Sequence, residues 1–284
     1  MKKLSALLIL SLAFVSLTPS LAFAVKPDGT GNSKPPSTST PELVGYDISY
    51  PQCGRRLPSD HYFGVVGVNG GTAANGNPCL AEQLTWAKNA KDGSKQDKVQ
   101  LYVNTANPGE YIDQVSTWPT SSTAENPFGP CDGTNTTACS WQYGWNRSVA
   151  AHNEYFTPAA QAAGISSSAT PYVWWLDIEM ANTWQSGSGE ALKRNVATLE
   201  GMAAYYQAKG ARVGLYTTAT QWNDITGNFV SSGSNLNGLA NWRPSGASLS
   251  NAISNCNVEP LTAGGYISMT QYVQKNIDHN HSCI

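Results

Sequence analysis

The stretch Trp174-Trp175-Leu176-Asp177-Ile178-Glu179 joins an apolar run to two acidic residues one position apart. Side chains of a β-strand alternate between its two faces, so Asp177 and Glu179 point the same way if the strand continues through them. A buried carboxylate is costly unless it is paired, hydrogen-bonded or hydrated. The stretch therefore predicts a cleft at the carboxyl end of a buried strand, where α/β barrels hold their active sites.

Strand-like and helix-like segments alternate on both sides of this stretch, which predicts a parallel sheet. A long insertion, from Thr105 to about Trp145, follows the third strand and carries its own cysteine pair. We expect an α/β fold, an irregular TIM-like (β/α) barrel, with only short helices in its last third. The predicted strands are 43–49, 63–68, 98–104, 170–179, 212–217, 238–242 and 266–273, with 277–280 as an eighth strand end, and the predicted helices are 78–91, 147–163 and 190–209.

The beginning of the chain has the features of an export signal over residues 1–24. Lys2 and Lys3 precede an apolar run that is too short to span a bilayer comfortably, and Ala22-Phe23-Ala24 fits a cleavage site. Residues 25–42 are rich in Pro, Ser and Thr and predict a flexible linker, and residues 43–284 predict one barrel domain. We expect a secreted protein, extracellular or associated with the cell wall, with no membrane segment after signal cleavage.

The charge and composition of the chain limit the classes of binding partner that we expect. Seventeen basic and nineteen acidic residues give a net charge of −2, and only 13% of residues are charged. No basic patch is present, which excludes nucleic acid as the expected partner. A surface rich in polar and aromatic residues suits a neutral polysaccharide, and we expect a monomer that uses no cofactor or metal.

Six cysteines in an exported chain indicate disulfides. The sequence alone permits 15 pairings, and free thiols remain an alternative. Short loop closure favours the pairs Cys53 with Cys79, Cys131 with Cys139, and Cys256 with Cys283.

Parallel strands of a barrel share one direction, so acids at their carboxyl ends converge on one mouth. Three predicted strand ends carry such acids, and the candidate catalytic residues are Asp47, Asp177, Glu179 and Asp278. Paired carboxylates are the groups that hydrolyse glycosidic bonds. Aromatic and amide side chains near the same ends are candidate sugar-binding residues, namely Tyr46, Tyr102, Asn104, Tyr216, Trp242, Gln271 and Tyr272.

The motifs at these strand ends resemble, in order and from residue 43 onward, those of glycoside hydrolase family 25, the lysozymes that cut peptidoglycan. Gly45-Tyr46-Asp47-Ile48-Ser49 with Gln52 resembles the opening motif, and Leu176-Asp177-Ile178-Glu179 resembles the D-x-E catalytic strand. Gln271-Tyr272 followed by Ile277-Asp278-His279-Asn280 is similar to the closing motif. Phe63 to Gly71, Gly214 to Thr218 with Trp222, and Leu239 to Trp242 are similar to further strands of the family.

The resemblance implies hydrolysis of N-acetylmuramyl bonds with net retention through substrate assistance. The spacing of Asp177 and Glu179 along the strand does not by itself decide between retention and inversion. Electrostatics then suggests roles. An ionised Asp177 is expected to raise the pKa of Glu179, the expected proton donor. Asp177 is expected to stabilise the oxocarbenium-like transition state or to orient the acetamido group of the substrate. Asp47 and Asp278 are expected to hold that group, a water, or the acid.

Two strand ends depart from the family pattern. Val68-Asn69-Gly70-Gly71 stands where a Thr-Glu-Gly type of sequence is usual, and Tyr102-Val103-Asn104 where the family typically has Tyr-His. The insertion is also unusual. Since these changes line the expected groove, the bond chemistry carries over more readily than the identity of the glycan.

Other readings of the same residues remain open. A non-catalytic glycan-binding protein can use the same barrel, because fold alone does not prove activity. A structural wall protein would instead engage another protein through the inserted segment. The tail residues Asp278, His279, His281 and Cys283 are metal-ligating types, although their spacing does not match a structural zinc site.

Overall fold

The structure is a computed structural model and describes residues 43–284. The predicted export signal and linker, residues 1–24 and 25–42, lie outside the described residues. Within the described part, no helix combines the length and apolar character needed to cross a membrane.

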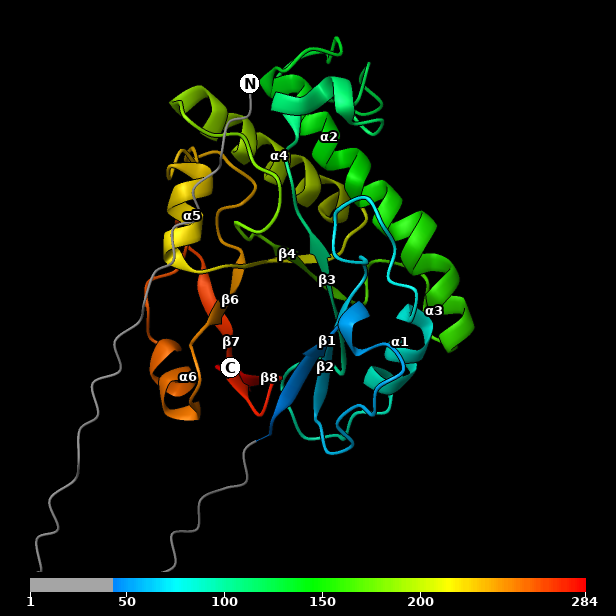
Figure 1. Cartoon of the computed structure of the whole chain (residues 1–284). Coiled ribbons are helices and arrows are strands. Elements are labelled where there is room, and N and C mark those ends of the chain that lie inside the picture. Colours follow the sequence, from blue (N-terminus) through cyan, green and yellow to red (C-terminus); the bar gives the residue numbers. More distant parts are fainter. Residues whose placement is uncertain (1–42) are drawn as a thin grey trace, which may run out of the picture. The chain divides into compact units, whose positions relative to one another are not determined.

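Eight strands form a closed barrel in sequence order (Figure 1). Each strand pairs with its neighbours in the chain, and the last strand pairs with the first. The α/β barrel expected from the sequence is therefore confirmed. The strands are β1 Gly45–Ile48, β2 Phe63–Gly67, β3 Val99–Asn104, β4 Val173–Asp177, β5 Arg212–Tyr216, β6 Ala240–Pro244, β7 Tyr266–Gln274 and β8 Ile277–Ser282.

The direction of β8 corrects the expectation of an all-parallel sheet. β8 runs antiparallel to both β7 and β1. Lys275 and Asn276 join β7 to β8 with φ of 53° and 59°, and a two-residue turn of this kind connects antiparallel strands only. Asp278, at the start of β8, pairs with Val273 near the end of β7. It therefore reaches the barrel mouth from the beginning of its strand.

Helices cover the outside of the barrel (Figure 1). One boundary prediction was wrong: the helix expected from residue 147 begins at Thr137, inside the predicted insertion. Thr136 caps it, because its side chain accepts a hydrogen bond from the Cys139 amide. The helices are α1 Leu80–Lys88, α2 Thr137–Ala150, α3 Thr157–Ala163, α4 Gly189–Ala208, α5 Ala219–Thr226 and α6 Leu249–Asn255, with short helical turns at Tyr50–Gln52, Gly109–Gln114 (η2) and Ala151–Phe156.

The three disulfides favoured by loop length are all formed. They join Cys53 to Cys79, Cys131 to Cys139, and Cys256 to Cys283. The second closes a loop inside the insertion, as expected. The third ties β8 to the helix before β7, next to the point where the barrel closes.

Helices α2 and α4 pack through two glycines. A Cβ atom on Gly144 would collide with the carbonyl of Thr198, and one on Gly201 would collide with the carbonyl of Trp141. The Thr198 hydroxyl also donates to the Ser140 carbonyl at 3.0 Å. This close backbone contact fixes the carboxyl end of the insertion on the surface of the barrel.

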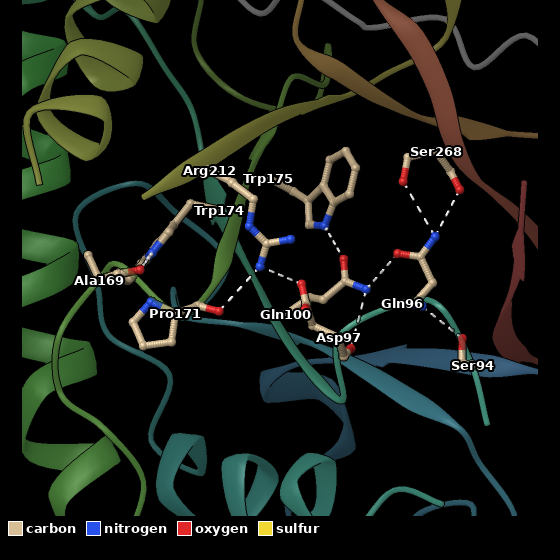
Figure 2. A network of polar contacts seen from close by, with 10 residues as sticks. All are labelled: Ser94, Gln96, Asp97, Gln100, Ala169, Pro171, Trp174, Trp175, Arg212 and Ser268. Carbon is tan, nitrogen blue, oxygen red and sulfur yellow. Dashed lines mark hydrogen bonds and ion pairs between the residues drawn. The ribbon is translucent and has the colours of Figure 1, made fainter. Parts of the chain in front are cut away.

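A network of buried polar side chains lies at the amino end of the barrel (Figure 2). Trp174 packs outside the barrel and Trp175 inside, as strand alternation predicts. Trp175 Nε1 donates to Gln100 Oε1 at 2.8 Å, Gln100 Nε2 donates to Gln96 Oε1 at 3.1 Å, and Gln96 Nε2 donates to the Ser268 carbonyl at 2.9 Å. Burying an amide group destabilises the fold little when the group is hydrogen-bonded, and the side chains of this network satisfy one another.

We predict that Gly144→Ala lowers the free energy of unfolding by about 1–3 kcal/mol, the cost of overpacking, even though alanine favours helix by about 1 kcal/mol. Guanidinium unfolding with the disulfides intact measures this change. Gly233→Ala is the control, because no atom lies within 4 Å of the position of its added Cβ, and we expect a change within about 0.5 kcal/mol. Equal stability of the two variants would contradict the proposed glycine contact.

Candidate active site

A cavity of about 230 Å³ opens at the carboxyl ends of the parallel strands. It brings together all four carboxylates predicted from the sequence, which come from β1, the end of β4 and the start of β8. A larger cavity, about 320 Å³, lies at the other end of the barrel, but it holds no carboxylate cluster. The lining of the mouth cavity is Asp47, Tyr102, Asp177, Glu179, Tyr216, Trp242, Gln271 and Asp278.

Asp47 is held by two amide donors. Gln271 Nε2 lies 3.1 Å from both carboxylate oxygens, and Asn280 Nδ2 lies 2.8 Å from Oδ1. Gln271 is oriented in turn by the Tyr216 hydroxyl, which donates to Gln271 Oε1 at 2.8 Å. Burial, followed by the charge of Asp278, raises the pKa of Asp47 to about 7, against the lowering effect of the two donors. Asp47 is therefore fixed in place, and its environment favours the protonated form more than water does.

Asp177 ends β4, and its carboxyl group is buried. Its Oδ2 accepts from Asn104 Nδ2 at 3.2 Å, whereas its buried Oδ1 has no hydrogen-bond partner. Burial first, and then the charges of Glu179 and Asp47, raise the pKa of Asp177 well above its usual value. Burial therefore opposes the ionisation of Asp177 that is expected from the sequence, and the assignment of charge to Asp177 and of the proton to Glu179 stays a prediction.

Glu179 lies two residues beyond β4 and is half-buried. Its carbonyl oxygen accepts from Trp184 Nε1 at 2.9 Å and from the Asn182 amide at 3.1 Å, which fixes the backbone at this position. Burial and the charge of Asp278 raise the pKa of Glu179. Burial likewise raises the pKa of Asp278, and His279 opposes that shift.

The cavity lining contains four carboxyl groups and no Lys, Arg or His. Burial and mutual repulsion oppose ionisation of all four, so each carboxyl group holds its proton to a higher pH than it would in water. Such groups titrate as a unit, and the remaining charge is shared among them. The cluster can donate a proton and can also stabilise a developing positive charge, which are the two requirements of glycoside hydrolysis.

The aromatic candidates divide between the two faces of the barrel wall. Tyr102 and Tyr216 line the cavity, and Trp242, only 2% exposed, packs against the Tyr216 ring at 4.3 Å. Tyr46 and Tyr272 are not brought to the cavity. Each is next in sequence to an inward-pointing site residue and contacts the ring of His279, at 4.8 and 5.0 Å.

Asn280 is a site residue that the sequence reasoning did not select. It donates to Asp47 and accepts from Trp242 Nε1 at 2.8 Å, so it links two walls of the mouth. The available signal was its position two residues after Asp278, on the same face of one strand. Asn280 lies within the predicted eighth strand end, from which only Asp278 is predicted as a catalytic residue.

The alternative metal site in the tail does not form. Cys283 is bonded to Cys256 and is therefore lost as a thiolate ligand. Among residues 43–284, no group of three or more His, Cys, Asp or Glu side chains is placed to hold a metal ion.

Comparisons with known proteins find similarity to lysozymes. The family model "Lysozyme-like protein 1" matches residues 157–253, from α3 to α6. "Probable GH family 25 lysozyme 2" of Dictyostelium discoideum is 44% identical over 56 residues, 20% of this chain and 24% of that protein. "Probable GH family 25 lysozyme 4" of the same organism is 41% identical over 68 residues, 24% of this chain and 30% of that protein. The matches therefore span about a quarter of the length of these relatives, and they confirm the resemblance to glycoside hydrolase family 25.

Two solved structures are similar over most of the chain. A muramidase from Trichobolus zukalii has 15% identity and a TM-score of 0.46, and covers 84% of this chain and 93% of its own. A family GH25 lysozyme from Aspergillus fumigatus has 16% identity and a TM-score of 0.48, and covers 85% and 94%. The strand pairing described above establishes the barrel without them.

We predict that Asp177→Asn raises the free energy of unfolding at pH 8, by about 1.4 kcal/mol for each unit by which folding raises the pKa of Asp177. The pKa of Asp177 is higher in the folded than in the unfolded chain, so wild-type stability falls as the pH rises above the unfolded value of 3.8. Asparagine does not ionise, and the variant avoids this loss.

Guanidinium unfolding at pH 4 and pH 8 measures the effect, which should be small at pH 4. Asp224→Asn removes an exposed carboxylate and serves as the control. A stabilisation of the Asp177 variant that is equal at both pH values would refute the electrostatic explanation.

Proposed function

We propose that this chain, a divergent relative of the family 25 lysozymes, is a glycosidase that hydrolyses cell-wall glycan. The observation that carries the proposal is the cluster of four carboxyl groups in one cavity with no cation in its lining. The N-acetylmuramyl bonds of peptidoglycan are the proposed target, supported by the lysozyme names of the matched relatives.

In the proposed mechanism, Glu179 donates its proton to the glycosidic oxygen as the bond to the anomeric carbon breaks. Glu179 suits this step because it is the less buried acid of the β4 pair, with a raised pKa and a fixed backbone. The substrate's own acetamido oxygen attacks the anomeric carbon from the opposite face. A water activated by Glu179 then opens the cyclic intermediate, giving net retention.

Asp177 receives the acetamido group in this scheme. Its buried Oδ1 lacks a partner within the protein, and an acetamido N–H can supply one. Positive charge develops on the sugar in the transition state, which favours ionisation of the neighbouring acids at that moment. Asp47 is the second carboxylate of the scheme, and hydrogen bonds from Gln271 and Asn280 hold it at a fixed position in the cavity.

The site of action is proposed to be outside the cell, with the protein acting as a monomer. The residue pattern of positions 1–24 supports export. Three disulfides in a chain with no free cysteine suit an oxidising compartment.

We predict that Glu179→Gln lowers the rate of peptidoglycan hydrolysis by about 10²–10⁴-fold, the contribution of a positioned acid, while glycan binding is retained. Mass spectrometry of soluble products should detect new reducing-end N-acetylmuramic acid with the wild type. Glu82→Gln, an exposed position in α1, is the matched control and should keep full activity.

Binding of glycan without turnover by the wild type would instead identify a non-catalytic glycan-binding protein. Equal turnover by the wild type and Glu179→Gln would refute the assignment of the acid. Absence of both turnover and binding would reject peptidoglycan as the target.

A further inference from the structure

A second hollow lies beside the acid cluster and is not part of it. It is a groove of about 540 Å³ between η2, at the start of the insertion, and the segment that follows Glu179. We call it the insertion groove. Its lining is Pro108, Tyr111, Gln114, Val115, Asn182, Thr183 and Trp184.

Gln185 cross-links the two walls of the insertion groove. This side chain is 1% exposed, and its Nε2 donates to Asn107 Oδ1 at 2.8 Å and to Asn135 Oδ1 at 2.9 Å. Its Oε1 accepts from Arg194 Nε of α4 at 2.6 Å. One residue therefore joins the segment carrying Trp184 to both ends of the insertion and to a long helix.

Two backbone contacts add to this cross-link. The Asn107 amide donates to the Thr183 carbonyl at 2.8 Å, and the Ser186 amide donates to the Glu110 carboxylate at 2.9 Å. Since hydrogen bonds within the protein hold both walls, the groove is pre-organised, which lowers the entropy cost of binding.

The chemistry of the lining selects a neutral ligand. None of the lining side chains is charged, and Tyr111 is 48% exposed. An exposed aromatic face offers apolar contact to a sugar ring, and the amides of Gln114 and Asn182 offer donors and acceptors for hydroxyl or acetamido groups. A charged peptide stem would find no ion-pair partner in this lining.

The groove is connected directly to the proposed proton donor. Trp184 lines the groove, and its Nε1 donates to the Glu179 carbonyl at 2.9 Å. The segment from Glu179 to Trp184 therefore borders both the acid cavity and the insertion groove, and a glycan chain bound at Glu179 can extend along it toward the groove.

We propose that the insertion groove is an additional subsite for one neutral N-acetylated sugar residue of the glycan chain, beyond the bond that is cut. Tyr111 is its stacking surface, and Trp184 forms the wall of the groove next to Glu179. This inference rests on the proposed function and adds to it the part of the chain that departs from the family pattern.

The test measures the affinity of Glu179→Gln for peptide-free peptidoglycan tetrasaccharide and disaccharide by titration calorimetry, with and without a change at Tyr111. We expect Tyr111→Ala to weaken tetrasaccharide binding about tenfold, or about 1.4 kcal/mol, through loss of the aromatic contact. Disaccharide binding should be unchanged. Tyr111→Phe keeps the ring and should restore most of the affinity.

The matched control is Tyr266→Ala, which removes an equally exposed tyrosine, 53% exposed, at the opposite end of the barrel. Circular dichroism checks that each variant is folded. Equal tetrasaccharide affinity of Tyr111→Ala and its parent, or no binding by the parent, overturns the subsite. Peptidoglycan hydrolysis by the wild type from the same preparation shows separately whether the proposed function survives.

Discussion

The antiparallel pairing of β8 with β7 and β1 is the contact on which the candidate site depends. It closes the barrel, and by reversing direction it presents the start of β8 at the mouth where the parallel strands end. Asp278 and Asn280 arrive there together because they are two positions apart on one strand. Asn280 then holds Asp47 from the first strand and accepts from Trp242 of the sixth. The first and last strands of the barrel thus contribute Asp47 and Asp278 to the same cavity as the acids at the end of β4.

The two ends of the barrel differ in whether their buried polar groups are hydrogen-bonded. At the amino end, glutamine and tryptophan side chains satisfy one another in a continuous network (Figure 2). At the mouth, Asp177 keeps an oxygen without a partner, and four acids share a cavity that contains no counter-charge. Burial without compensation destabilises the folded state, and such local conflict is typical of functional sites. The contrast distinguishes the mouth from the larger cavity at the other end.

The insertion is part of the barrel architecture and also borders the site. Its carboxyl end continues into α2, which packs on α4 through Gly144 and Gly201. Its amino end, η2, forms one wall of the insertion groove, and Gln185 connects both ends to the segment that follows Glu179. A long segment tied down at both ends can shape a binding surface at low entropic cost. The same ties place that surface next to the acid.

The sequence by itself indicated the barrel class and the four acids and favoured the three disulfide pairs, because short-range patterns carry that information. These patterns are the apolar runs that end in carboxylates, the loop lengths between cysteines, and the order of the motifs. It did not determine the reversal of β8, the start of α2 at Thr137 or the outward placement of Tyr46 and Tyr272. It also assigned the charge to Asp177, whereas burial among Glu179 and Asp47 favours the neutral form. Direction, burial and charge sharing depend on which residues meet across the fold, and only the tertiary structure decides that.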